Sequence, residues 1–261
     1  LVDLRKRSFV PVGGDLQGPG VIHHMQLDAV LDPATATLDT IAASQPAVAF
    51  DPSPLTAGES CRDPVDRIRA LAGTPLDSTF ATGVSAAVGG PRGCSHILTL
   101  AHLLGSTAAW ALARERVGAG AGAVRPAGQR VFCRNLIVDG QELRPGRVQL
   151  AAQLTDLHFA PAPLVARPMD RFAGELEVRV LAEVDLETFA LVGMRAAERR
   201  RGPADFVTAA WAPRDDVLAP LAGRSLGAGI TATLLAHLGD RPADRPLLDA
   251  LLLLGPTLIQ C

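Results

Sequence analysis

The chain has 261 residues, of which 48% are apolar, and a formal net charge of −2. This length can bury one large core or two smaller ones. The near-neutral charge excludes the broad positive field that attracts nucleic acid, so no nucleic-acid partner is expected. The basic run Arg199–Arg201 is interpreted as a solvated loop or helix end.

The spacing of the cysteines indicates the cellular compartment of the protein. Cys61, Cys94, Cys133 and Cys261 are far apart, and their spacing matches neither a secreted disulfide framework nor a CxxC zinc motif. We find no basic start followed by an apolar signal core, and the apolar run Leu247–Leu254 is too short to span a bilayer. The sequence therefore predicts a cytoplasmic protein with free thiols and no membrane partner.

The first half of the chain predicts strands followed by helices. Asp32-Pro33 supplies the turn of an antiparallel hairpin, and Asp63-Pro64 and Ser95 are typical helix starts. Proline and glycine favour a loop over residues 46–58. The predicted strands cover residues 4–12, which lead into a turn at Gly13-Gly14, then 21–31 and 35–43. The predicted helices cover residues 63–73, 76–88 and 96–116.

The second half predicts a similar order after a Gly/Ala-rich segment. Asp139-Gly140 is expected to form the turn of its first hairpin. The predicted strands cover residues 131–138, 148–159, 175–183 and 187–196. The predicted helices cover residues 214–222, 226–238 and 246–260.

The two halves repeat each other at a constant offset of 150 residues. Leu71-Ala72-Gly73 matches Leu221-Ala222-Gly223, and Leu103-Leu104-Gly105 matches Leu253-Leu254-Gly255. The predicted fold class is α+β, with two pseudo-symmetric repeats that each place antiparallel strands before about three helices. The first repeat covers residues 1–117, a linker covers 118–129, and a degenerate second repeat covers 130–261. Two similar halves favour pseudo-two-fold packing and a possible homodimer.

A cluster of reactive side chains stands at one helix start. Gly93-Cys94-Ser95-His96 brings a thiol, a hydroxyl and an imidazole together. The second repeat lacks these groups and also lacks counterparts of Cys61 and His23. At the offset positions stand Ala173, Trp211, Asp244, Arg245 and Pro246. The helix therefore does not need a thiol or an imidazole in order to start.

Three functional interpretations compete with a purely structural helix cap. Cys94 and Ser95 at a helix N-terminus could bind an anionic or enolate-like group while His96 moves protons. Alternatively, Cys94 could be a nucleophile with His96 or His23 as its base, although residues i and i+2 of a helix do not face each other. Cys61, Cys94, His96 and His23 could also bind a metal, although their spacing is long.

Other histidines have simpler interpretations. His23 and His24 lie on one predicted strand, so their rings point to opposite faces of the sheet. Asp156 and His158 share one face of another strand, which we interpret as solvated. His102 lies on a different helical face from the reactive cluster and is expected to be structural.

The motifs of the first half resemble a known family. They are Ile22-His23-His24-Met25, Cys61 before a helix, Leu71-Ala72-Gly73, and Gly93-Cys94-Ser95-His96-Ile97. Together they are similar to the bacterial domain-of-unknown-function family numbered 2889, over residues 4–112. Two positions depart from its pattern, since His24 replaces an aspartate and Ser95 replaces a threonine. The missing aspartate removes one partner for a catalytic histidine. The resemblance implies a small-molecule enzyme in the breakdown of aromatic or other hydrophobic compounds.

The sequence therefore predicts a cofactor-independent lyase or isomerase. It would use general acid/base chemistry, such as retro-aldol C–C cleavage or proton transfer, on a hydrophobic, aromatic small molecule. Phosphate-binding loops and common hydrolase motifs are absent, and no metal is predicted. The expected catalytic residues are His23, Cys94 and His96. The expected substrate-binding residues are Cys61, Arg62, Ser95 and His24. The alternatives are a non-catalytic binding module and a zinc-dependent or cysteine-nucleophile hydrolase.

Overall fold

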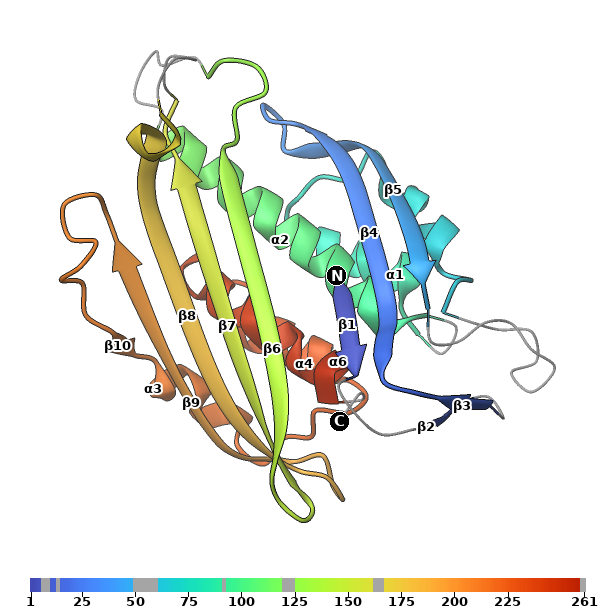
Figure 1. The fold of residues 1–261 in the computed structure, drawn as a ribbon. Coiled ribbons are helices and arrows are strands. Elements are labelled where there is room, and N and C mark those ends of the chain that lie inside the picture. Colours follow the sequence, from blue (N-terminus) through green and yellow to red (C-terminus); the bar gives the residue numbers. More distant parts are fainter. Residues whose placement is uncertain are drawn as a thin grey trace. The chain divides into compact units, whose positions relative to one another are not determined.

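Each of the two parts of the chain combines a sheet with helices. A computed structural model describes residues 1–5, 10–12, 15–48, 61–90, 93–118, 125–161 and 167–258. The chain forms two compact units, Leu1–Ala109 and Trp110–Ile259. Both units carry antiparallel strands and helices (Figure 1), which confirms the α+β class. The predicted Gly13-Gly14 turn and parts of the predicted 46–58 loop and 118–129 linker lie outside the described residues.

The first unit contains a three-stranded sheet in the order β1-β4-β5 and a separate pair, β2 and β3. The strands are β1 Val2–Arg5, β2 Val10–Val12, β3 Asp15–Gln17, β4 Gly20–Asp32 and β5 Thr37–Ala47. The predicted hairpin is confirmed, and the Asp32 carboxylate accepts hydrogen bonds from the Ala34 amide and the Thr35 hydroxyl in its turn. The predicted single strand over residues 4–12 is wrong, because β1 pairs with β4 whereas β2 pairs with β3.

Three helices follow these strands, namely η2 Val65–Leu71, α1 Phe80–Val88 and α2 Ser95–Gly118. The first is a 3₁₀-helix, and a left-handed Gly73 (φ +79°) follows it. The second begins later than predicted, because the Asp77 carboxylate accepts hydrogen bonds from the Thr79 amide and hydroxyl in a preceding turn. The third has nearly its predicted extent.

Helix α2 contributes its first half to the core of the first unit. Ile97 and Ala101 pack with residues of the strands and of the two preceding helices. Gly105 allows a close approach to the ring of Phe80 at the start of α1. By length and composition, residues Ser95–Arg116 could also cross a membrane, a criterion that core helices of soluble proteins meet as well.

The second unit contains a five-stranded antiparallel sheet in the order β10-β9-β8-β7-β6. Its strands are β6 Phe132–Arg144, β7 Arg147–Phe159, β8 Phe172–Asp185, β9 Leu191–Arg201 and β10 Ala212–Pro213. The predicted turn at Asp139-Gly140 is wrong, because both residues continue the β6 ladder opposite Ala151 and Leu150. The chain turns instead at Gly146, whose positive φ of 76° suits a tight connection.

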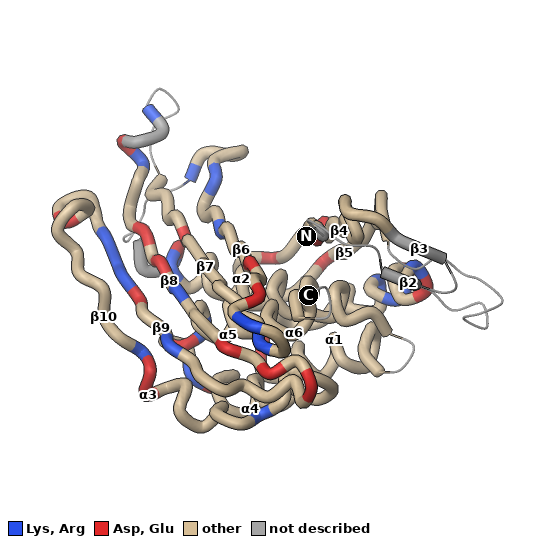
Figure 2. The backbone as a smooth tube through the Cα atoms, turned by 60° about the horizontal axis from the view of Figure 1, so that its bottom comes forward, with Lys and Arg blue, Asp and Glu red and all other residues tan. Residues whose placement is uncertain are grey.

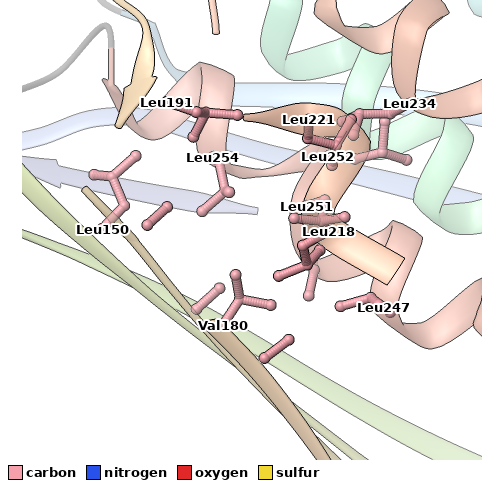
Figure 3. Close-up of a cluster of buried hydrophobic side chains, with 14 of the residues drawn as sticks. Leu150, Val180, Leu191, Leu218, Leu221, Leu234, Leu247, Leu251, Leu252 and Leu254 are labelled. Atoms are coloured by element: carbon pink, nitrogen blue, oxygen red, sulfur yellow. The ribbon is translucent and has the colours of Figure 1, made fainter. Parts of the chain in front are cut away.

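The second unit also contains short helices, most of which follow the strands in the chain. They are η3 Pro168–Arg171, α3 Asp215–Leu218, η4 Ala219–Leu221, α4 Ile230–Leu238, η5 Pro242–Asp244, α5 Arg245–Leu252 and α6 Leu254–Leu258. The predicted helix over 246–260 is therefore divided at Leu253. Helix α5 packs on β7 and β8. Leu150 and Val180 of those strands face a cluster of leucines from the helices (Figure 3).

Charged residues link the strands of the second unit. Acidic and basic positions are interspersed along β8 and β9 (Figure 2). Glu175 forms an ion pair of 2.7 Å with Arg201, and Arg199 pairs with Glu177. The basic run at residues 199–201 is therefore part of a paired strand and not a loop or helix end.

Local hydrogen bonds of the first unit recur in the second. The matching backbone pairs are Leu38 with Gly73 and Leu191 with Gly223, and Ala36 with Leu76 and Phe189 with Leu226. The offset is 153 residues in the strands, as in Leu38 and Leu191, and 150 in the helices, as in α1 and α4. The correspondence thus does not keep the constant offset expected from the sequence.

Candidate functional site

Five polar side chains from separate segments of the first unit lie close together. Asp3 is on β1, opposite His23 of β4 in the strand ladder. Cys61 precedes η2, and Cys94 and His96 stand at the start of α2. His23, Cys94 and His96 are buried, and Cys61 is half-buried. We call these five residues the Asp3 cluster.

Asp3 connects the two imidazoles. Its Oδ2 accepts a hydrogen bond from His23 Nδ1 at 3.4 Å and lies 3.2 Å from His96 Nε2. The two rings are stacked, with centroids 4.1 Å apart. Burial acts to raise the pKa of the Asp3 carboxyl, but the hydrogen bonds from His23 and His96 prevail and lower it to about 2. A carboxylate therefore faces both histidines at neutral pH.

Cys94 occupies the capping position of helix α2. Its carbonyl accepts the first helical hydrogen bond, from the Leu98 amide at 3.0 Å. Because Cys94 precedes the helix, its Sγ lies 4.0 Å from His96 Nδ1, and the expectation that i and i+2 spacing keeps the pair apart is wrong. The hydrogen bond with Cys61 lowers the pKa of Cys94 most, and burial acts in the opposite direction. Hydrogen bonds with His96 and the Ile97 amide lower it further, and the result is a pKa of about 4.

His96 lies between a carboxylate and a thiol. Burial acts to lower the pKa of its imidazole, whereas the hydrogen bonds to Asp3 and Cys94 raise it to about 9. At neutral pH this arrangement therefore places a charged imidazole between two anions. Such an arrangement orients a proton donor or acceptor.

Cys61 brings a second thiol to the site. Its Sγ, the Sγ of Cys94 and one ring nitrogen of His23 all lie within 4.8 Å of one another. Cys61 and Cys94 are both thiols and are not joined in a disulfide. The three groups offer the sulfur and nitrogen ligands that soft divalent metals prefer.

The remaining predicted site residues lie outside the Asp3 cluster. Arg62 is exposed, and its Nη1 donates a hydrogen bond to the Gln45 carbonyl at 3.2 Å. Ser95 is exposed in the first turn of α2. His24 is half-buried on the strand face opposite that of His23.

The sequence did not indicate Asp3 as a site residue. Its only signal was an acidic residue between two apolar ones, Val2 and Leu4, at a position before the predicted strand. The pairing of Asp3 with His23 depends on the β1–β4 register, which no local pattern specifies. Asp3 thus supplies the carboxylate that the histidine at position 24 had put in doubt.

In the second unit, Asp156 is part of a buried ion-pair network, and His158 is buried on the same strand. Arg134 binds Asp156 through two hydrogen bonds of 2.6 and 2.7 Å and also bonds to Asp249 of α5. The expectation of a solvated strand face is wrong, because this face of β7 lies beneath α5. Burial lowers the pKa of His158 to about 4. The network pairs its buried charges and resembles a structural ion triad.

The comparisons with known proteins concern the unit that contains the Asp3 cluster. No curated protein and no solved structure matches the chain. A family model does match, over residues 1–110, and this range includes all five residues of the cluster. That family model is described as "Protein of unknown function (DUF2889)", and residues 1–110 are similar to it.

Proposed function

We propose that the first unit is the catalytic part of a small-molecule enzyme that works by general acid/base chemistry. One observation carries this proposal: a single carboxylate oxygen holds two stacked imidazoles beside two thiols in a buried setting. Burying ionisable groups is unfavourable unless they are paired, and perturbed groups of this kind concentrate at functional sites.

In the proposed mechanism, His96 transfers the proton. Asp3 engages Nε2 of His96 and so fixes the orientation of the ring and stabilises its charged form. The other nitrogen, Nδ1, lies on the side of Cys94 at the long distance of 4.0 Å. A substrate atom beside Nδ1 would exchange its proton with the ring while Asp3 keeps the ring in place.

The surroundings of the cluster favour an apolar substrate. Cys94 belongs to the same apolar cluster as Met25 and Ile97. A site of this polarity suits a hydrophobic, aromatic molecule whose reacting group is polar. Proton transfer next to a carbonyl and retro-aldol C–C cleavage both need an acid and a base that contact the substrate. Isomerases and lyases catalyse these two reactions, so we propose that the enzyme belongs to one of these classes.

We also infer that the second unit is a duplicated copy that kept its packing and lost its chemistry. The recurring hydrogen bonds around Leu38 and Leu191 support a common origin. Asp244 stands at the position that corresponds to Cys94, and its carboxylate binds Arg214 instead of a histidine. Since the residues that correspond to the Asp3 cluster lack its thiols and imidazoles, we expect one active site in each chain.

The experiment combines a substrate screen with substitutions in the full chain. Aromatic aldehydes, ketones and hydroxy acids are incubated with the protein, and conversion is followed by chromatography. His96→Gln should lower kcat by about 10²–10⁴-fold, the range expected for a lost general acid or base. Cys133→Ser, which removes a thiol outside the cluster, should leave kcat unchanged.

Two outcomes would refute the proposal. One is a folded His96→Gln variant, as judged by circular dichroism, that keeps full turnover of a converted compound. The other is a compound that raises the melting temperature of the wild-type chain without yielding any product across the screen, which would favour a binding module.

A further inference from the structure

Three side chains of the Asp3 cluster have the chemistry and spacing of metal ligands. They come from β4, from the segment before η2, and from the residue before α2. A ring nitrogen of His23 and the sulfurs of Cys61 and Cys94 lie within 4.8 Å of one another. Tetrahedral coordination by two thiolates and an imidazole needs ligand atoms only slightly closer than this, at about 3.5–4 Å from one another.

His23 has a nitrogen that the protein leaves without a partner. The ring is 2% exposed, and its Nδ1 donates a hydrogen bond to Asp3. Within the described part of the chain, the buried Nε2 has no hydrogen-bond partner. A buried polar atom of this kind calls for an explanation, and an ion is one of the few available. The hydrogen bond at Nδ1 also leaves the Nε2 lone pair free to bind a cation.

We propose that His23 Nε2, Cys61 Sγ and Cys94 Sγ bind one Zn²⁺ ion and leave its fourth position open. Three protein ligands with an open position are typical of catalytic zinc, whereas structural sites use four. Metal binding stands on this geometry alone. Its catalytic role rests on the function proposed above, in which the ion would polarise a substrate oxygen beside His96.

His96 is not one of the ligands. Its Nε2 faces Asp3 at 3.2 Å, and its Nδ1 faces Cys94 at 4.0 Å. The four-ligand set considered from the sequence is thereby reduced to three. His96 instead donates toward the Cys94 sulfur or toward a substrate at the open position.

The groups around the three ligands fit a bound cation. Asp3 contacts the non-ligating nitrogen of His23, which is the carboxylate–histidine–metal arrangement common around zinc. A divalent ion also offsets the charge of the two sulfur ligands, which bind zinc as thiolates. Pairing the buried charges in this way avoids the cost of burying net charge.

Metal binding can be measured directly on the wild-type chain. Metal analysis of the purified protein should find one zinc per chain. After removal of zinc by a chelator, titration with Co²⁺ should produce the strong thiolate-to-metal absorption and the visible bands of tetrahedral coordination, saturating at one equivalent. Failure of the folded wild-type chain to give these bands would overturn the proposal.

Cys61 offers a second measurement, with Cys133 as its matched control. Both are half-buried thiols outside any disulfide, but only Cys61 belongs to the proposed site. Zn²⁺ should slow alkylation of Cys61 at least about tenfold and leave Cys133 unaffected, as followed by peptide mass spectrometry. Equal protection of both thiols, or protection of Cys61 that does not depend on zinc, would overturn the proposal.

Substitutions then distinguish residues that bind the metal from residues that only contact a ligand. Cys61→Ser and His23→Gln should abolish the cobalt absorption, while Cys133→Ser should keep it. Asp3→Asn should weaken cobalt affinity about 10–100-fold, the usual effect of losing a partner of a ligating histidine. Unchanged affinity in a folded Cys61→Ser variant would contradict the assignment, whatever the other variants do.

The metal site and the proposed function can fail independently. His96→Gln should retain one equivalent of metal and lose turnover. If it retains both, the acid/base role of His96 is wrong and the metal site stands. If the wild-type chain binds no metal while His96→Gln still abolishes turnover, the metal site is wrong and the function stands.

Discussion

Gly105 is the residue at which the packing of helix α2 can be tested most directly. A Cβ at this position would lie 2.2 Å from Cε1 and 2.6 Å from Cδ1 of the Phe80 ring. The ring is buried, at 6% exposure, so it cannot swing into solvent at no cost. Gly105→Ala should therefore destabilise the first unit, although alanine is the better helix former.

Two opposing effects set the size of this change. Alanine should gain up to about 1 kcal/mol over glycine from helix propensity. Carbon atoms pack at about 3.5–4.0 Å, so the Phe80 ring must retreat by more than about 1 Å. Overpacking of this kind typically costs about 1–3 kcal/mol. We expect a net loss of about 1–2 kcal/mol in the free energy of unfolding.

Gly83 in α1 is the matched control. A Cβ there would meet its nearest atoms, on Leu71 and Thr74, at 3.7 and 3.9 Å, which is ordinary contact. Gly83→Ala should therefore stabilise the first unit by up to about 1 kcal/mol. The two substitutions are chemically identical and both lie in helices, so their opposite signs isolate the contact with Phe80.

The assay must report on the first unit alone. Both tryptophans, Trp110 and Trp211, belong to the second unit, so fluorescence does not serve. Hydrogen exchange of peptides from α1 and α2, measured by mass spectrometry, reports on the opening of the first unit. A loss of about 1.4 kcal/mol speeds exchange through opening about tenfold. Slower exchange in Gly105→Ala, or equal shifts in both variants, would refute the reasoning.

Three further predictions concern buried charge and backbone conformation. Burial lowers the pKa of His102 to about 4 from 6.5, so the unfolded chain gains a proton first as the pH falls. Stability should decline between pH 6.5 and 4 by up to about 3 kcal/mol, and urea titrations of His102→Phe should show less of this decline. Arg134→Leu leaves Asp156 and Asp249 buried without their arginine, and tryptophan fluorescence in urea should show a loss of about 3–5 kcal/mol. Gly73→Ala forces a side chain into a left-handed conformation, and hydrogen exchange should show a loss of about 1 kcal/mol, whereas no loss would contradict the φ of +79°.

Local patterns predicted the elements whose structure is set locally. The β4–β5 hairpin follows from alternating apolar residues on either side of Asp32-Pro33, and helix α2 follows from a long apolar periodicity after Gly93-Cys94. The turn predicted at Asp139-Gly140 is wrong because a non-local interaction sets the structure there. Its turn propensity was overridden by the continuing ladder with β7, an interaction between strands that a short motif does not report.

In the candidate site, too, local sequence predicted some residues, whereas others depend on contacts between distant segments. Cys94 and His96 were found because they are neighbours in the sequence and because the second half lacks their equivalents. Asp3 was missed because its role depends on which strand pairs with β4 and in which register. The grouping of Cys61 with His23 likewise depends on how distant segments pack, so the sequence could name both as possible metal ligands but could not show that they lie together.

The position of Asp3 on a four-residue edge strand has a consequence for how often the site is assembled. Short edge strands open locally at a lower free-energy cost than the core. Every opening of β1 withdraws the carboxylate from both imidazoles at once, so under the function proposed above its opening equilibrium would set the active fraction of molecules. If opening costs only about 1.4 kcal/mol, about one molecule in eleven lacks the carboxylate at any moment. Conditions or contacts that favour closed β1 would then raise the measured kcat without touching a reacting group.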